Sequence, residues 1–220
     1  MIKAIIFDFD GTILDTETAW YYAFRDAYKE HGVDLTLDLY SQCIGTSLHQ
    51  FNPYEYLMTE LKLPIDKQLF KQSVHDQHSA LMNQEQIRPG IIEYLNLAKE
   101  SGLKIGLASS SSIKWVEKYL NQLGIRDYFE CIRTSEDVVH VKPDPELYIQ
   151  ALKGLGVDAS EAIAIEDSPN GARAAAAAGM HCIVVPNAIT KLLSFDEPNT
   201  YHQGECLTHI DLNKMLVGSL

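Results

Sequence analysis

The sequence predicts a three-layer α/β core built on a parallel sheet, with a helical cap domain inserted into that core. Two observations predict the core: short apolar runs recur along the chain, and amphipathic helical patterns separate them. This alternation is typical of a parallel sheet with helices on both faces. A third observation predicts the cap, because one long segment near the start has helical periodicity and no convincing strand.

Five short apolar runs are the predicted strands. Their alternation with helices indicates a Rossmann-like core. The runs read KAIIF (3–7), KIGLAS (104–109), ECIRT (130–134), AIAIE (162–166) and HCIVV (181–185).

Helical patterns lie between these runs. Helices are predicted over 91–101 and over 113–123, where each apolar stripe stops before a glycine. A further helix is expected to start with Asp144 as its N-cap and Pro145 at its first position. The alanine-rich residues 172–179 predict a helix that packs closely on the sheet.

The segment 17–84 is the predicted helical cap domain, and residues 1–16 and 85–220 are the predicted catalytic core. Helical spacing in the first part of the cap places four residues on one face. They are Trp20, Phe24, Ala27 and Tyr28. We expect Trp20 and the tyrosines of this helix to form the core of the cap; the alternative is that one or two of them touch the substrate.

His75 and His78 lie three residues apart, with Asp76 between them. This spacing would place both imidazoles on one side of a helix. A zinc site needs at least a third ligand, and none is apparent in the sequence. We therefore expect an exposed polar face of a cap helix here.

Composition restricts the kind of partner. A chain of 220 residues can form one core with a small inserted domain. The net charge of −12 argues against nucleic acid or an anionic membrane as a partner, because both attract clustered Lys and Arg. It does not exclude a small anionic substrate, since a bound cation can invert the local field. A monomer is the default expectation.

The cysteines and the N-terminus predict a cytoplasmic protein. The apolar run 4–7 is too short for a signal peptide or a membrane span. Scattered cysteines without a C-x-x-C pair favour free thiols in a reducing compartment over a disulfide framework or a zinc site. These cysteines are Cys43, Cys131, Cys182 and Cys206.

Polar residues follow the predicted strands, where the loops of a parallel sheet converge and ligands bind. Each group has an ordinary structural explanation as a turn, a helix cap or a solvated side chain. Their occurrence in order at four places along one edge favours function. They are Asp8 and Asp10, the serines 109–112, Lys142, and Glu166 with Asp167.

This set of side chains suits phosphoryl transfer. A carboxylate can accept a phosphoryl group and divide one difficult displacement into two easier ones. With Asp8, Glu166 and Asp167 ionised, a bound phosphate dianion would make the local charge more negative, to about −5. Each close pair of like charges at ~4 Å would oppose binding by about 4 kcal/mol. The carboxylates therefore imply a cation besides Lys142, and an all-oxygen site favours Mg²⁺.

The two neighbouring aspartates receive different predicted roles. Crowding of carboxylates raises one pKa, so that one group can hold a proton while the other stays charged. We predict Asp8 as the nucleophile and Asp10 as the acid that protonates the leaving oxygen and then as the base that activates water. Ser109 and the amides of the following helix could hold phosphate oxygens.

Four sequence motifs resemble those of the haloacid dehalogenase-like hydrolases. They are DFDGT, the serine after the second strand, KPDP and IEDSPNGARAA, and their order and spacing span nearly the whole chain. The segment between the first two motifs is similar to the cap of the group that contains β-phosphoglucomutase and small sugar-phosphate and nucleotide phosphatases.

The resemblance implies a set of functional residues. The Mg²⁺ ligands would be the Asp8 carboxylate, the Asp10 backbone carbonyl and Asp167, with Glu166 as a nearby or occasional ligand. The phosphate-binding residues would be Ser109, Ser110 and Lys142. The dehalogenases of the family work without Mg²⁺, and the carboxylates beyond Asp8 argue against that chemistry here.

The substrate is expected to be a small phosphorylated metabolite, a sugar phosphate or a nucleotide, and the reaction hydrolysis. The alternatives are a phosphomutase of the β-phosphoglucomutase type and a non-catalytic phosphate-binding protein. Mutases carry a histidine where Trp20 stands and basic residues near a Gly-x-Ser stretch, which here reads IGTSL (44–48). No Arg or Lys occurs between Lys29 and Lys62.

Overall fold

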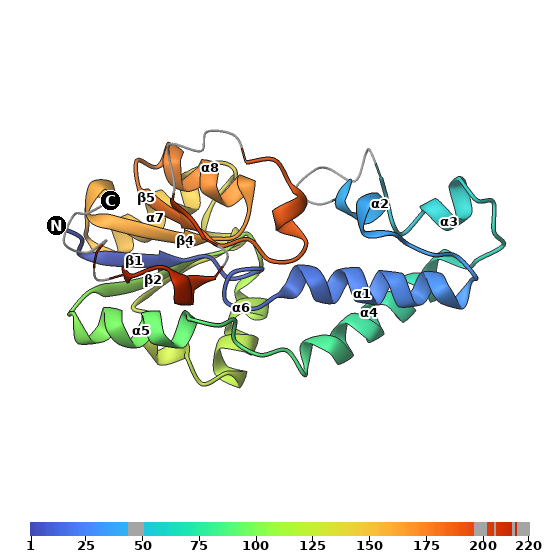
Figure 1. Ribbon diagram of the computed structural model, residues 1–220, viewed down its shortest axis with the longest axis horizontal. Coiled ribbons are helices and arrows are strands. Elements are labelled where there is room, and N and C mark those ends of the chain that lie inside the picture. Colours follow the sequence, from blue (N-terminus) through green and yellow to red (C-terminus); the bar gives the residue numbers. More distant parts are fainter. Residues whose placement is uncertain (44–50, 196–201, 205, 213, 215–220) are drawn as a thin grey trace.

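The computed structural model describes residues 1–43, 51–195, 202–204, 206–212 and 214. The molecule is elongated and has two lobes, which lie on the left and right of Figure 1. The left lobe contains the sheet, and the right lobe contains α1 to α4.

Within the described residues, the sheet has six parallel strands in the order β3-β2-β1-β4-β5-β6. The five predicted strands are confirmed, and β6 is an addition that the sequence did not predict. The strands are β1 (Ala4–Phe7), β2 (Lys104–Ala108), β3 (Cys131–Arg133), β4 (Ala162–Glu166), β5 (His181–Val184) and β6 (His202–Gln203).

Strand register aligns the carboxyl ends of the central strands. Phe7, the last residue of β1, pairs with Leu107 of β2 and with Ile165 of β4. All four residues of β1 are buried, as expected for a strand with neighbours on both sides and helices above and below. The residues that follow β1, β2 and β4 therefore lie side by side at one edge.

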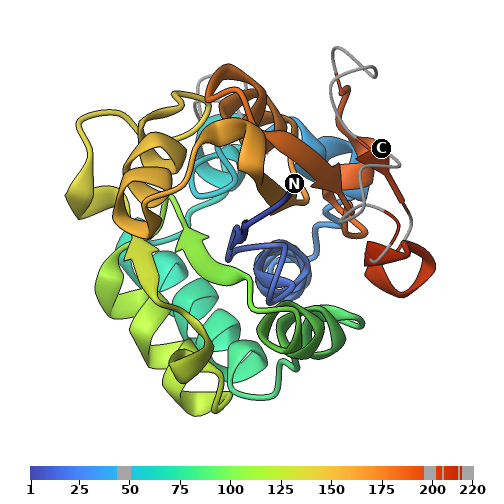
Figure 2. The ribbon, with the colours of Figure 1, turned by 90° about the vertical axis from the view of Figure 1, so that its left-hand side faces the viewer.

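Helices cover both faces of the sheet, as predicted (Figure 2). One apolar cluster joins α5 and α6 to the side chains of Ile5 and Phe7. The other joins α7 and α8 to Ala4 and Ile6, because successive strand residues point to opposite faces. The helices of this lobe are α5 (Ile91–Glu100), α6 (Ile113–Gln122), α7 (Glu146–Leu155) and α8 (Pro169–Ala177).

Five short 3-10 helices complete the described chain. They are η1 (Arg126–Tyr128), η2 (Ser135–Asp137), η3 (Ala159–Glu161), η4 (Thr190–Leu192) and η5 (Leu207–His209).

The second lobe is helical. Its long helices α1 and α4 pack side by side (Figure 1), around a separate apolar cluster that includes Phe24, Tyr28 and Phe70. The helices are α1 (Thr16–Glu30), α2 (Leu37–Ser41), α3 (Tyr56–Thr59) and α4 (Lys67–Met82).

The expectation that His75 and His78 share an exposed polar face is wrong for His78. His75 is exposed, but His78 is 3% exposed. It belongs to a stripe of buried residues spaced by four along α4, which faces inward. The stripe is Phe70, Val74, His78 and Met82.

Two chain crossings connect the lobes. Leu14 of the first crossing and Ile87 of the second form an antiparallel bridge. Asp15 caps α1 by accepting a hydrogen bond from the Thr18 amide at 3.1 Å. The domain boundaries 16/17 and 84/85 stay predictions.

The start of α7 differs from the prediction. The helix begins at Glu146, and Pro145 rather than Asp144 is its N-cap. Asp144 Oδ1 still accepts a hydrogen bond from the Glu146 amide at 3.0 Å. The predicted capping side chain is therefore used, one position earlier than expected.

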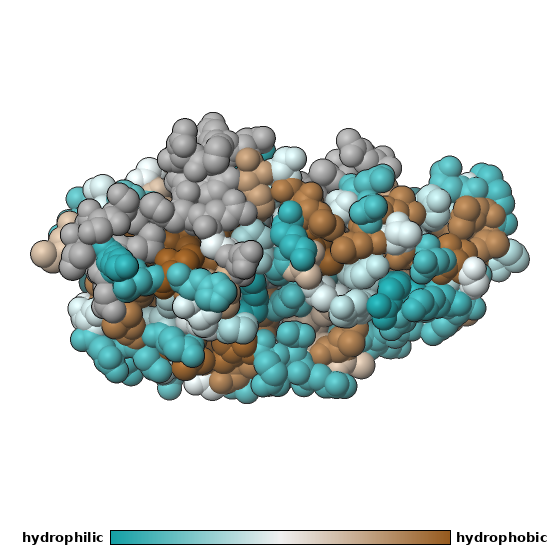
Figure 3. Space-filling model, viewed as in Figure 1, coloured by the Kyte–Doolittle hydropathy of each residue, from teal (hydrophilic) through white to brown (hydrophobic). Residues whose placement is uncertain are grey.

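The surface drawn in Figure 3 mixes hydrophilic and hydrophobic residues over both lobes. None of the described helices combines the length and hydrophobicity that crossing a lipid bilayer requires.

Candidate active site

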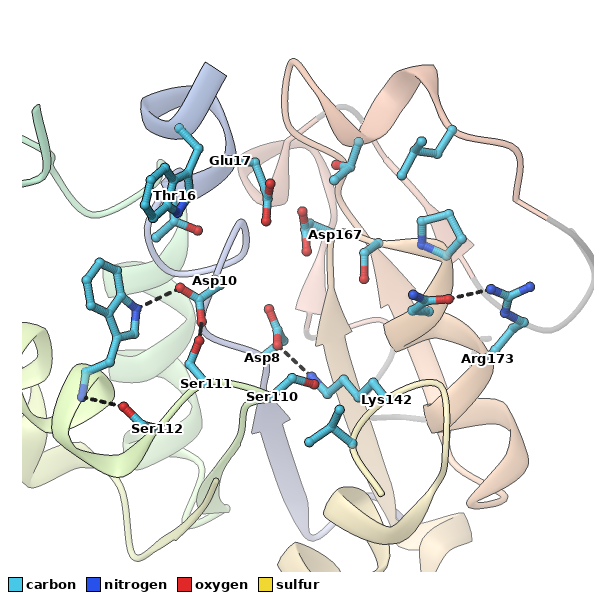
Figure 4. A pocket seen from close by; sticks show the side chains of 18 of the residues that line it. Asp8, Asp10, Thr16, Glu17, Ser110, Ser111, Ser112, Lys142, Asp167 and Arg173 are labelled. Carbon is cyan, nitrogen blue, oxygen red and sulfur yellow. Dashed lines mark hydrogen bonds and ion pairs between the residues drawn. The ribbon is translucent and has the colours of Figure 1, made fainter. Parts of the chain in front are cut away.

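Segments far apart in the sequence meet at the carboxyl edge of the sheet. Asp8 follows β1, Ser109 follows β2 and Glu166 is the last residue of β4. Lys142 comes from the loop before α7, and its Nζ lies 2.6 Å from Asp8 Oδ1, 2.7 Å from Glu166 Oε1 and 2.7 Å from the Ala108 carbonyl oxygen. Figure 4 shows Lys142 and Asp8 pointing toward each other.

Lys142 is a buried cation. Its side chain is 5% exposed, and those of Asp8 and Glu166 are 8% and 0% exposed. Burial by itself would lower the pKa of Lys142, but the carboxylates of Asp8 and Glu166 outweigh burial and raise it. The Tyr148 ring adds a cation–π contact, with its centroid 4.9 Å from Nζ. The ammonium therefore stays charged at neutral pH.

Three buried carboxylates form a cluster beside this lysine. One ligand oxygen from each of Asp8, Glu166 and Asp167 lies within 4.8 Å of the others. Tyr148 Oη donates to Glu166 Oε1 at 2.6 Å, and Asn187 Nδ2 donates to Asp167 Oδ2 at 2.9 Å. In contrast, Asp8 Oδ2 is buried and has no hydrogen-bond partner among the described residues.

These residues fit a divalent cation. Burial, and then the charge of Asp8, raises the pKa of Glu166 and of Asp167, so the crowded carboxylates resist ionisation together. The unpartnered Asp8 Oδ2 is a buried oxygen with a free coordination site, and the whole donor set is oxygen, which Mg²⁺ prefers. The structure thus brings the three predicted carboxylate ligands together.

Asp10 lies beside this cluster, and its carboxylate turns toward α6. Its Oδ2 accepts hydrogen bonds from Ser111 Oγ at 2.6 Å and from Ser109 Oγ at 3.3 Å, and its Oδ1 accepts from Trp115 Nε1 at 2.8 Å. Figure 4 shows Asp10 directed at Ser111. Burial is the main cause of its raised pKa, and the charge of Asp8 contributes less. The predicted direction is present, but the predicted cause, crowding of the two aspartates, is secondary.

The two predicted phosphate-binding serines occupy different environments. Ser109 is 1% exposed, and its Oγ accepts a hydrogen bond from the Ser111 amide at 3.0 Å. Ser110 is exposed and lines a cavity together with Lys142. Ser112 is the N-cap of α6. The serine run therefore serves both the fold and the cavity wall.

A cavity of about 700 Å³ opens between the lobes over these residues. Its volume is in the range of small-molecule sites. The second lobe contributes Thr16, Glu17 and Trp20 to its wall. Lining residues from the sheet lobe are Asp8, Asp10, Ser110, Ser111, Ser112, Trp115, Val141, Lys142, Asp167, Ser168, Pro169, Asn170, Arg173, Thr190, Leu193 and Ser194.

Glu17 is an acidic residue of this wall that the sequence analysis did not select. Burial, and then the carboxylates of Asp10 and Asp15, raises the pKa of Glu17 to about 7. Figure 4 shows the Glu17 carboxyl near Asp167. Its place one residue after the start of α1, at the junction of the two lobes, was the available sequence signal.

Three side chains that the sequence analysis also did not select support the candidate site through hydrogen bonds. Arg88 binds the carbonyl oxygens of Gly11, Val185 and Pro186, and so ties the first loop to the end of β5. Asn187 follows β5, so the rule that selected the other strand ends could have found it. Tyr148 lies inside α7, and no local sequence pattern indicates that it contacts Glu166.

Comparison with known families gives the class of this protein. A profile of the haloacid dehalogenase-like hydrolases matches residues 5–185. The chain belongs to this family. Its similarity to phosphatases of Bacillus subtilis and Escherichia coli assigns it to the phosphatase group, so that it is a phosphoric monoester hydrolase.

Similar proteins agree with this assignment. The chain is 46% identical to "Putative phosphatase YhcW" of Bacillus subtilis (strain 168) over 98% of this chain and 97% of that protein. It is 33% identical to hexitol phosphatase B of Escherichia coli (strain K12) over 84% of each. The crystal structure of CbbY from Rhodobacter sphaeroides in complex with phosphate is similar at a TM-score of 0.69 and 30% identity, covering 94% of this chain and 95% of that one.

Proposed function

We propose that this protein is a Mg²⁺-dependent phosphatase that hydrolyses small sugar phosphates through a phosphorylated Asp8. One observation supports this most directly: Asp8 has one oxygen bound by Lys142, and its other oxygen is buried beside Glu166 and Asp167 with no hydrogen-bond partner in the described part of the chain. The first contact places the positive charge of Lys142 against Asp8, and the second leaves an oxygen for a cation.

In the first half-reaction, an oxygen of Asp8 attacks phosphorus and the ester P–O bond breaks. The proton of Asp10 passes to the leaving oxygen, and the alcohol departs. In the second half-reaction, Asp10 takes a proton from water, the water oxygen bonds to phosphorus, and the bond between phosphorus and Asp8 breaks. Inorganic phosphate is released, and both aspartates return to their initial states.

The cation would be held by the carboxylates of Asp8 and Asp167 and the backbone carbonyl of Asp10, with Glu166 nearby, and would neutralise charge between the nucleophile and the phosphate. Lys142 supplies the permanent positive charge. Ser110 in the cavity wall, Ser109 behind it and the amides that begin α6 would hold phosphate oxygens.

The cavity wall supports a hydroxylated substrate. It also presents the side chains of Glu17, Ser111 and Ser112, which can hydrogen-bond sugar hydroxyls, and the aromatic ring of Trp20. Hexitol phosphatase B is similar over most of its length, which supports a phosphorylated sugar or polyol as substrate. The four cysteines are free, which supports a cytoplasmic location.

A phosphomutase would need to hold a second phosphate in the same cavity. The described cap residues in its wall carry no positive charge, and the segment 44–48, where mutases carry basic residues, lies outside the described residues. Hydrolysis is therefore the better supported reaction.

The test is release of phosphate from p-nitrophenyl phosphate and from a panel of sugar phosphates. We expect activity with Mg²⁺, loss of activity with EDTA, and a decrease of at least about 10³-fold in Asp8→Asn. The exposed carboxylate Asp34 provides a control, since Asp34→Asn should act like the wild type. Full activity of Asp8→Asn would overturn the proposal.

A further inference from the structure

The two oxygens of Asp10 have different kinds of partners. Oδ1 accepts from the Trp115 indole Nε1–H at 2.8 Å, and an indole nitrogen can only donate. Oδ2 faces the hydroxyls of Ser109 and Ser111, which can donate or accept. The indole therefore keeps Oδ1 as an acceptor. A proton carried by Asp10 is directed to Oδ2.

Four aromatic rings from three helices pack together beside this contact. The Trp115 ring of α6 is stacked with the ring of His78 of α4, with centroids 5.8 Å apart and planes at 14°. His78 is stacked in turn on Trp20 of α1 at 3.6 Å and 9°. Tyr119 packs edge-on against Trp115 at 4.7 Å and 67°. The indole that contacts Asp10 is thus held from the helical lobe.

Hydrogen bonding does not explain why a histidine occupies the middle of this stack. Its Nε2 is buried and has no partner in the part of the chain that the structure describes. Stacking on Trp20 explains the flat orientation of the ring. Burial, and then the charges of His75 and Lys118, lowers the pKa of His78 to about 4. The ring is therefore neutral at working pH, and its role is one of packing.

We propose that Trp115 is a positioning residue for Asp10, and that His78 and Trp20 of the helical lobe hold its indole in place. The proposal rests on the function proposed above, in which Asp10 donates a proton to the leaving oxygen. Without the indole, the carboxyl group can rotate between its partners, and its proton is no longer confined to the oxygen beside the serines. With the indole in place, the helical lobe contributes to proton transfer by holding Trp115, although the acid itself belongs to the sheet lobe.

The experiment uses the dependence on the leaving group. The ratio kcat/KM reports the steps up to release of the alcohol, and only a poor leaving group needs a proton in those steps. In Trp115→Phe, we expect kcat/KM for an alkyl ester such as sorbitol 6-phosphate to fall by about 10–100-fold, within the range of general acid catalysis. The value for p-nitrophenyl phosphate should stay within about threefold of the wild type.

Glu117→Ala is the matched control. Glu117 lies on α6, the helix of Trp115, and this variant removes its 2.8 Å ion pair with Arg126 of η1; none of the hydrogen bonds described for Asp10 involves Glu117. A general destabilisation of α6 should lower kcat/KM for both esters by the same factor. If Trp115→Phe lowers both values by the same factor, or lowers neither, the positioning role is wrong and the proposed phosphatase stands. If the wild type hydrolyses neither ester with Mg²⁺, the proposed function fails and this inference fails with it.

A second pair of variants tests the link to the helical lobe. His78→Phe keeps an aromatic ring in the stack and should retain the wild-type ratio between the two esters. His78→Ala should reproduce the selective loss for the alkyl ester by about 3–10-fold. Equal behaviour of the two variants would show that the stack does not position Trp115.

The indole protons give a readout that does not need turnover. The chain has two tryptophans, so Trp20→Phe and Trp115→Phe assign the two indole N–H signals in an NMR spectrum. Asp10→Asn should move the Trp115 signal, and His78→Ala should make this proton exchange faster with water. An unchanged Trp115 signal in both variants would overturn the proposed contact.

Discussion

The ammonium of Lys142 lies 2.6 Å from the carboxylate of Asp8, although 134 positions separate the two residues in the chain. Both side chains are more than nine-tenths buried. A buried ion pair needs further hydrogen bonds to offset desolvation, and Glu166 and the Ala108 carbonyl provide them to Lys142. The contact joins the end of the first strand to the loop before α7 and places a fixed positive charge beside Asp8.

Replacement of Lys142 by methionine should be severe for both activity and stability. It leaves Asp8 and Glu166 as buried carboxylates without their cation, and the loss of one partner of a buried pair costs about 3–5 kcal/mol. We expect kcat/KM to fall by at least about 10³-fold. The free energy of unfolding, measured in urea with EDTA, should fall by about 3–5 kcal/mol. Lys114→Met, at an exposed position of α6, is the control. Wild-type stability in Lys142→Met would contradict the observed ion pair.

Magnesium should stabilise the folded protein. A ligand that binds only the folded state adds about 2.7 kcal/mol at a concentration of 100 times its Kd. We therefore expect the thermal midpoint to rise with Mg²⁺ and to return to its initial value when EDTA is added. Asp167→Asn should reduce this rise, since it removes a charged ligand while Asn187 can still contact the side chain. A midpoint that does not respond to Mg²⁺ in the wild type would argue against the cation site.

Two glycines provide a matched pair. Gly11 and Gly32 both have positive φ, 84° and 72°, so alanine at either position costs about 1–2 kcal/mol in backbone strain. An added Cβ at Gly11 would overlap the Asp167 carboxylate, whereas at Gly32 it would meet nothing within 4 Å. Gly11→Ala should therefore lose activity and the Mg²⁺-induced rise in midpoint, and Gly32→Ala should keep both. Equal retention of activity in the two variants would show that Asp167 can move without consequence.

His78 should make the protein less stable in acid. Its pKa is about 4 in the folded state and about 6.5 in an unfolded chain, so the unfolded state binds the proton first. The stabilisation by neutral His78 is complete above about pH 6.5 and decreases as the pH falls toward 4. The expected loss from pH 7 to pH 4 is on the order of 2 kcal/mol.

Urea unfolding as a function of pH measures this loss. Other groups titrate over the same range, so the relevant quantity is the difference between the wild type and His78→Phe, which keeps the ring and removes the titration. The curve of the variant should be flatter between pH 6.5 and 4. Parallel curves would show that burial of His78 does not oppose its protonation.

Most of the core could be predicted because its signals are local. The five apolar runs and the glycines that end the helices require only neighbouring residues, and these strands are confirmed. The strand β6 has two residues and carries no such signal. His78 was wrongly expected on an exposed face because its i, i+3 relation to His75 was considered and its place in the buried i, i+4 stripe of α4 was not.

The sequence alone identifies the kinds of groups that lie at the edge of the sheet, because parallel strands bring their carboxyl ends to one side whatever the side chains are. It could not determine which of these groups touch. Only the tertiary structure decided that Lys142 pairs with Asp8, that Asp10 turns to Trp115, and that the helical lobe reaches this contact through His78. Such contacts depend on how helices distant in the chain pack, which periodicity and spacing do not encode.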